Sequence, residues 1–239
     1  MNNDEIYIFA HIPKTGGTTL DRHFEKHMNL HVDYIPLSGP GEQRAIEQGL
    51  KPFKERSLEE RMKAKVILGH QVRWNTHELV PGKKPRYIVL IREPISWLVS
   101  RYNWAMKVRR ERREAIISFD EWFEETKHLQ SQLFWFLRNF AETKFIRRMP
   151  GRRRLRRMNE IIEQFSMVTI TERLDEDGPK LLQLMGMPDE LERKNVAGVD
   201  HDKILKVTDE LRERLEKDME TDLQLYSQWK QKSPMIQWS

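Results

Sequence analysis

The sequence predicts an α/β fold in which a parallel β-sheet is flanked by helices. Four short apolar runs are bounded by polar or turn residues, and their continuous hydrophobicity is typical of strands buried on both faces; they are 6–10, 66–68, 87–91 and 167–170. Helical patterns fill the intervals, and strands that alternate with helices indicate an α/β domain. The length of 239 residues suits one such domain, which we expect to span residues 1–239.

The first elements are short. The strand at 6–10 is followed, after a glycine pair, by a helix expected over 18–28, and a weaker strand candidate lies at 31–35. Ser57 precedes Glu60 by three residues, which is the spacing of a capping box and predicts a short helix before the next strand.

The middle of the chain is predicted to be mainly helical. Pro94 suits the first turn of a helix that runs towards Arg113. Residues 119–140 have a helical pattern rich in aromatic side chains, in one piece or two, and 159–165 leads into the fourth strand. We therefore expect a helical insertion at about 105–160.

Two helices are predicted near the C-terminal end. Pro179 and Gly186 are the start and stop signals of a helix over 179–185. From 202 to about 229, apolar residues recur at steps of three and four; they are Ile204, Val207, Leu211, Leu215, Met219 and Leu223. This single stripe favours a helix packed on the domain over one that binds a partner.

Composition excludes several classes of protein. The chain has no cysteine, which excludes a disulfide framework, a thiolate zinc site and a cysteine nucleophile. The first ten residues lack the features of a signal peptide, and apolar runs of about five residues are far shorter than the ~20 residues of a membrane-spanning helix. We expect a cytoplasmic protein.

The segment after the first strand has the chemistry of an anion site. Residues 11–20, HIPKTGGTTL, form a tight loop that leads directly into a helix. Gly16 and Gly17 allow backbone N–H groups to turn inward, and the helix N-terminus adds positive dipole. The side chains that add charge or hydroxyl donors are Lys14, Thr15, Thr18 and Thr19. This P-loop-like arrangement suits a phosphate-type oxyanion.

The loop differs from the Walker sequence, in which the lysine follows the second glycine. Here Lys14 precedes both glycines, and no predicted strand ends in an Asp placed to hold magnesium. These differences disfavour a magnesium-dependent nucleoside triphosphatase, and we predict no metal ligand.

Arg92 marks a second candidate anion site. It follows the strand at 87–91, at the edge where α/β sheets bind ligands, and its guanidinium can hold a phosphate through two parallel hydrogen bonds. Ser96 and Ser100 share a face of the following helix. Arg92 and Ser100 could therefore hold one phosphate from two sides.

These segments resemble the sulfotransferases that use 3′-phosphoadenosine 5′-phosphosulfate (PAPS). Residues 11–18 are similar to the family's loop H-x-P-K-T-G-[GS]-[TS], in the form found in the branch of heparan sulfate 2-O- and 6-O-sulfotransferases and their bacterial relatives. Arg92, Pro94 and Ser100 match the pattern that binds the 3′-phosphate. The resemblance implies that PAPS is held by Lys14, Thr15, Gly16, Gly17, Thr18, Thr19, Arg92 and Ser100, without a metal.

Gly69-His70 follows the second strand at the same edge. An imidazole with a pKa near 6.5 can take a proton from an alcohol, and the 2-O-sulfotransferases have a Gly-His with a general base at the corresponding place. The resemblance therefore implies this role for His70. His11, which is expected to pack beneath the loop, and His77, in a polar stretch, are the alternatives.

Two later segments match the family loosely. Residues 167–175 resemble V-G-x-T-E-x-[LF], but Thr169 stands where glycine is usual, so we predict no chemical role for Glu172 or Arg173. Residues 193–198 fall where related enzymes fold a late loop over the nucleotide. The resemblance spans roughly residues 5–200.

Two basic runs suggest contact with a polyanion. Residues 144–157 contain eight Lys or Arg and no acid, and 107–113 contain five against one Glu. They form either a solvated helix face or a groove for an acidic saccharide, and no recognised nucleic-acid motif accompanies them. The tryptophans that could stack on sugars, or else fill the core, are Trp97, Trp104, Trp122 and Trp135.

The leading hypothesis is a metal-independent sulfotransferase. An acceptor hydroxyl, with an acidic saccharide as one candidate, attacks sulfur in line and adenosine 3′,5′-bisphosphate leaves. Lys14 stabilises the charge of the leaving group and His70 removes the acceptor proton. The alternatives are a P-loop-like phosphoryl-transfer enzyme and a non-catalytic polyanion-binding protein whose basic insertion is the functional part.

Overall fold

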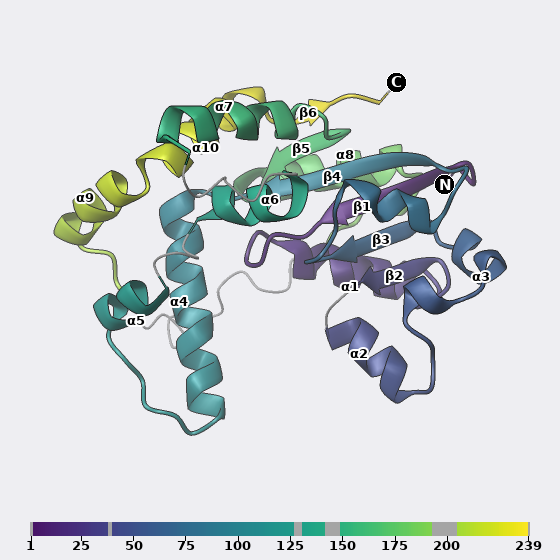
Figure 1. Cartoon of the computed structure of the whole chain (residues 1–239), viewed down its shortest axis with the longest axis horizontal. Coiled ribbons are helices and arrows are strands. Elements are labelled where there is room, and N and C mark those ends of the chain that lie inside the picture. The colour runs from purple at the N-terminus through teal and green to yellow at the C-terminus, as the bar shows by residue number, and fades with distance from the viewer. Residues whose placement is uncertain (1, 38–39, 127–130, 142–148, 193–204, 239) are drawn as a thin grey trace.

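The fold is taken from a computed structural model of the chain, which describes residues 2–37, 40–126, 131–141, 149–192 and 205–238 (Figure 1). Within these ranges six strands form one sheet in the order β2-β3-β1-β4-β5-β6. The strands are β1 (Glu5–Ala10), β2 (Tyr34–Leu37), β3 (Val66–Gly69), β4 (Lys84–Ile91), β5 (Met167–Ile170) and β6 (Met235–Ile236). The first five pair in parallel, and β6 pairs antiparallel to β5.

Helices connect the strands and form most of the second half of the chain. They are α1 (Gly17–His27), α2 (Pro40–Glu47), α3 (Leu58–Met62), α4 (Pro94–Glu111), α5 (Phe119–Thr126), α6 (Gln132–Phe140), α7 (Gly151–Ile162), α8 (Leu174–Leu184), α9 (Asp209–Asp218) and α10 (Glu220–Lys232). Short 3-10 turns lie at Phe53–Glu55, Trp74–Leu79 and Thr171–Arg173. The capping box predicted at Ser57 is confirmed, because Ser57 Oγ accepts from Glu60 N and Glu60 Oε2 accepts from Ser57 N.

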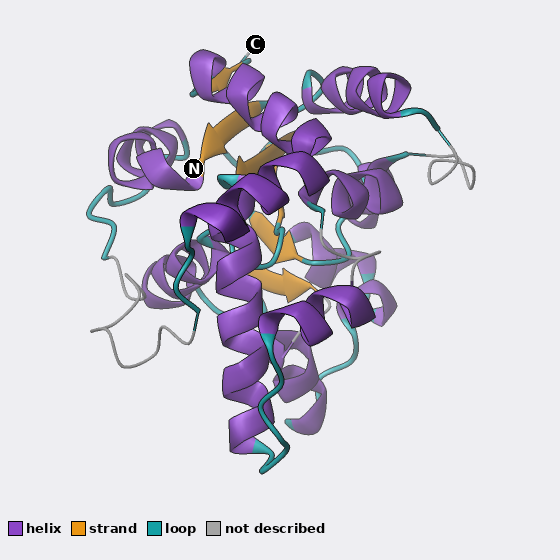
Figure 2. Cartoon of the chain, turned by 90° about the vertical axis from the view of Figure 1, so that its left-hand side faces the viewer, coloured by secondary structure: helices purple, strands orange, loops and turns teal. Residues whose placement is uncertain are grey.

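Alternate residues of the strands belong to two separate core layers. Ile6 and Ile8 of β1 pack with apolar residues of α4, α6, α7 and α10. Tyr7 and Phe9 pack with residues of α1 and α8 on the opposite face. Figure 2 shows helices on both sides of the strands. This double burial explains the continuous apolar runs and confirms the predicted α/β fold with a largely parallel sheet.

Helix boundaries differ from the prediction at two places. The helix predicted over 179–185 begins at Leu174, so Pro179 lies inside α8 and is not its start. The first turn contains three acidic residues, which favour a helix N-terminus, and Asp177 there accepts a hydrogen bond of 2.6 Å from Thr169 Oγ1. The helix predicted over 159–165 begins earlier, at Gly151, directly after Pro150.

The stripe predicted as one helix forms two. Helices α9 and α10 meet at Met219, whose backbone leaves the helical conformation, and residues 202–204 of the predicted range lie outside the described residues. Leu215 and Trp229 are buried, and α10 contacts α7 and β5, so packing on the domain is confirmed. After α10, β6 adds a short edge to the sheet that the sequence did not predict.

Within the described residues, no helix combines the length and the apolar character needed to cross a membrane. The same part of the chain shows no group of three or more His, Asp or Glu side chains that could hold a metal ion.

Candidate active site

The loop between β1 and α1 has an unusual backbone conformation, which is held by hydrogen bonds within the loop and from Thr171. Lys14 has a φ of 69° and Gly16 a φ of 91°, so both occupy the left-handed region. A non-glycine residue in this region costs free energy and is often found where a ligand binds. Thr15 is buried, its Oγ1 donates to Ile12 O (2.8 Å), and its carbonyl accepts from Thr171 Oγ1 (2.9 Å). The loop is therefore pre-shaped.

The N-terminus of α1 is open for an anion. Its N-cap is Gly16, which offers no side-chain oxygen, and its first turn contains no acidic residue. Thr19 N donates to Gly16 O (3.0 Å), whereas within the described chain the N–H groups of Gly17 and Thr18 make no hydrogen bond. Unsatisfied N–H groups and the helix dipole favour negative charge at this end.

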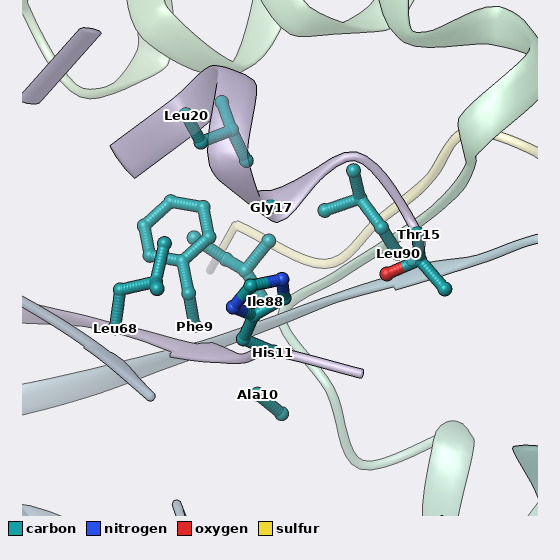
Figure 3. A pocket seen from close by; sticks show the side chains of 9 residues that line it. All are labelled: Phe9, Ala10, His11, Thr15, Gly17, Leu20, Leu68, Ile88 and Leu90. Carbon is teal, nitrogen blue, oxygen red and sulfur yellow. The ribbon is translucent and has the colours of Figure 1, made fainter. Parts of the chain in front are cut away.

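His11 lies directly beneath the loop, as the sequence predicted. Figure 3 shows its ring below Gly17, and a Cβ added to Gly17 would lie 2.1 Å from His11 Nε2. The cavity here is about 10 Å³, which is about the space of one water molecule. A phosphate group is too large for it, so an anion would bind on the outer side of the loop.

This position makes His11 a poor base. Burial, together with the smaller effects of His70 and Lys14, lowers the pKa of His11 from its ordinary 6.5 to about 3. His11 is therefore neutral near pH 7.

We expect the free energy of unfolding to decrease as the pH falls from about 6.5 towards 3, because the unfolded chain binds a proton at His11 that the native protein does not. One such proton gives at most about 1.4 kcal/mol per pH unit. Urea unfolding at about pH 5 and about pH 7, compared between wild type and His11→Gln, measures the effect. The variant should lose part of the pH dependence, and identical dependence in both proteins would contradict the assignment.

Arg92 reaches the loop from the end of β4. Its Nη1 donates to Lys14 O (3.0 Å), and Trp97 Nε1 of the following helix donates to Pro13 O (2.7 Å). The structure thus brings Lys14 and Arg92 together, as expected. It also shows that Trp97 is fully buried and supports the loop, which excludes stacking of this residue on a sugar.

The site has excess positive charge. Burial lowers the pKa of Lys14, and the nearby charges of Arg92 and Lys107 lower it further. Burial also lowers the pKa of Arg92, an effect that Glu172 and Glu93 partly offset. Among the described residues, no carboxylate forms an ion pair with Lys14 or Arg92. Two half-buried cations without a bound counter-charge favour an anionic ligand.

His70 lies beside the loop with one ring nitrogen fixed. Its Nδ1 is 2.8 Å from His11 O, and because a carbonyl oxygen can only accept, Nδ1 carries the proton. The neutral ring therefore has its lone pair on Nε2. The ring stacks on His11 with 4.4 Å between centroids, and Asn139 Nδ2 donates to His70 O (2.8 Å). His70 is held as a base would need to be.

The other candidates differ in position. His77 Nδ1 contacts Trp74 O (2.7 Å) and Tyr87 Oη, so this histidine orders its own turn. Thr18 is exposed on the first turn of α1, and Ser100 is half-buried on the second turn of α4. Both residues lie on the helices that the sequence predicted for them, and their role as ligands stays a prediction.

The basic runs are only partly described. Lys107 lies on α4, close enough to Lys14 to affect its pKa, whereas 144–148 and the loop at 193–198 lie outside the described residues. The exposed arginines of α7 are Arg152, Arg153 and Arg156. Trp122 is buried, and Trp135 packs against the core, but Trp104 is 56% exposed.

Sequence reasoning missed Gln132 and did not assign Glu172. Gln132 forms two hydrogen bonds with the backbone of Arg92, and Glu172 Oε1 accepts from Glu93 N (3.0 Å). Both contacts join residues far apart in the chain, so no local pattern indicates them.

Comparison with known proteins identifies the family of this chain. A model of the sulfotransferase family matches residues 1–228. Among solved structures, the crystal structure of a sulfotransferase from Alicyclobacillus acidocaldarius is similar, with 16% identity, a TM-score of 0.47, and coverage of 95% of this chain and 96% of that chain. No curated protein matches the sequence. Because the family model covers nearly the whole chain, this protein belongs to the sulfotransferase family and is an enzyme of sulfuryl transfer.

Proposed function

We propose that the enzyme transfers a sulfuryl group from PAPS to an acceptor hydroxyl by in-line displacement, without a metal ion. One observation supports this most strongly: Lys14 and Arg92, from loops after two neighbouring strands, are joined by a 3.0 Å hydrogen bond and form no ion pair with a described carboxylate. Two cations at one edge of a parallel sheet suit a ligand with two anionic groups.

The residues present fit a nucleotide that bears phosphate at both its 3′ and 5′ positions. Lys14 and the open N–H groups of Gly17 and Thr18 suit the 5′ end. Arg92 donates one N–H to the loop, and its remaining donors together with Ser100 suit the 3′-phosphate. When bound, PAPS supplies an activated sulfuryl group and a phosphate leaving group.

The remaining roles are stabilisation of negative charge, by Lys14, and removal of a proton, by His70. The ammonium of Lys14 and the loop N–H groups stabilise negative charge that develops beside them during transfer. Nε2 of His70 accepts the proton of the acceptor hydroxyl, while Nδ1–H remains bonded to His11 O and keeps the ring oriented.

For the acceptor we propose an acidic saccharide. Lys107, an exposed cation of α4, is close enough to Lys14 to affect its pKa. Arg152 adds an exposed positive charge on α7, and Trp104 offers an exposed ring on α4. Positive surface charge attracts anionic chains, and aromatic rings stack on sugar faces. Magnesium-dependent consumption of ATP would instead favour the phosphoryl-transfer alternative.

Titration calorimetry with adenosine 3′,5′-bisphosphate tests the two-phosphate site. We expect wild type to bind it more tightly than 5′-AMP, and Lys14→Ala and Arg92→Ala to weaken binding roughly 10- to 100-fold, as expected for charge-assisted hydrogen bonds of about 1.5–3 kcal/mol. Arg92→Ala should affect the bisphosphate more than 5′-AMP.

Lys54→Ala, at an exposed lysine of the 3-10 turn Phe53–Glu55, is the matched control and should bind like wild type. Wild-type affinity for the bisphosphate no greater than for 5′-AMP would contradict the proposal.

A further inference from the structure

We infer that Gln132 is a positioning residue for Arg92, so that the helical insertion sets the direction of the guanidinium at the sheet edge. The inference rests on the proposed function, in which Arg92 binds the 3′-phosphate of the donor.

Gln132 satisfies both backbone groups of Arg92 with one side chain. Its Nε2 donates to Arg92 O (2.6 Å) and its Oε1 accepts from Arg92 N (3.0 Å). The strand β4 ends at Ile91, which is paired with Ile170 of β5, so Arg92 lies just beyond the last rung of the sheet. The amide of Gln132 therefore takes the place of a missing neighbouring strand.

Gln132 is itself held firmly. It is 2% exposed at the first residue of α6, and Asp222 of α10 accepts from its N–H through Oδ2 (2.9 Å). Asp222 Oδ1 accepts from Ser131 Oγ (2.8 Å), and Asp222 is 5% exposed. A buried residue whose backbone N–H and side-chain amide both have fixed partners has little freedom to move. The geometry of Arg92 is thereby linked to α10.

Glu93, the next residue of the same turn, is held by the side chain of Glu172. Glu172, just after β5, accepts from Glu93 N through Oε1 (3.0 Å) and from Tyr226 Oη of α10 through Oε2 (3.2 Å). The backbone of Arg92 and Glu93 is thus braced through two separate side chains, both anchored on α10. Such double support is typical of residues whose orientation must be kept within narrow limits.

The chemistry of this contact requires an amide. Glutamate at 132 has the same length but offers no N–H, so a carboxylate oxygen would face Arg92 O at a distance of 2.6 Å. Methionine has similar size but can make neither bond. Gln132→Glu and Gln132→Met therefore remove the clamp in two different ways, and the second keeps the packing.

The test measures the affinity of each variant for adenosine 3′,5′-bisphosphate and for 5′-AMP by calorimetry, together with Tm. We expect both Gln132 variants to lose at least about 10-fold in affinity for the bisphosphate and less than about twofold for 5′-AMP. Selective loss supports a positioning role, because a general loss of structure lowers both affinities. Gln164→Glu, at an exposed position after α7, is the control for added charge and should behave like wild type.

The outcomes separate this inference from the proposed function. If wild type prefers the bisphosphate, Arg92→Ala abolishes the preference, and both Gln132 variants retain it, the positioning role is wrong and the proposed function stands. Equal losses for both nucleotides with a lowered Tm would also overturn the inference, since they indicate a purely structural role. If wild type itself shows no preference, the proposed function fails and the inference fails with it.

Discussion

Replacing His70 by glutamine is expected to reduce turnover roughly 100- to 10,000-fold while nucleotide affinity stays within about twofold of wild type. Glutamine retains polar atoms near the positions of the ring nitrogens, but it cannot accept a proton at neutral pH. Since Nδ1–H is bonded to His11 O, the lone pair of Nε2 is the basic site that this change removes. Release of adenosine 3′,5′-bisphosphate from PAPS in the presence of a hydroxyl acceptor measures turnover.

His77→Gln is the matched control. His77 was one of the two alternative bases, with His11, but its ring contacts Trp74 O of its own turn and Tyr87 Oη of β4, so we expect turnover within a few-fold of wild type. Full activity of His70→Gln, or a loss confined to His77→Gln, would place the general base elsewhere.

Gly17→Ala is expected to disrupt the loop between β1 and α1. The new methyl group would lie 2.1 Å from His11 Nε2, a separation that atoms cannot tolerate, so either the loop or the imidazole must move. Overpacking of this kind costs about 1–3 kcal/mol of unfolding free energy, and displacement of the loop should also weaken nucleotide binding. Urea unfolding and calorimetry measure the two effects.

A second substitution identifies the cause. His11→Ala removes the ring that the methyl group meets, so Gly17→Ala should cost much less in the His11→Ala background, and the double-mutant cycle should show strong coupling. Gly151→Ala, where the nearest atom would be Thr221 Oγ1 at 3.3 Å, is the control and should have little effect. Additive costs for Gly17→Ala and His11→Ala would show that their contact is not what requires glycine.

Four of the five parallel strands were predictable because each contains one continuous apolar run. Burial on both faces leaves this local signature in 6–10, 66–68, 87–91 and 167–170, and all four became strands with at most a few residues of difference. The short strand β6 and the helix α2 have no such signature. The start of α7 at Gly151 was missed because Gly151 is followed by three arginines and the apolar residues of the helix begin only at Leu155.

The placement of the candidate site residues was predictable where they belong to contiguous motifs. Lys14, Arg92 and His70 each follow a strand, and parallel pairing brings such positions to one edge. Gln132 was not predictable, because in sequence it is one polar residue beside an aromatic helix. Its significance comes from contact with a backbone 40 residues earlier in the chain. Non-local contacts of this kind become visible only in the folded molecule.

The support that α10 gives to the Arg92–Glu93 turn has a consequence for biosynthesis. The loop with Lys14 and the turn with Arg92 leave the ribosome well before residues 220–232 exist, so the nascent chain contains both proposed phosphate ligands without the α10 contacts that support Arg92. On the proposed function, the ability to bind the donor would then arise late, when α10 docks, and not gradually as the motifs emerge.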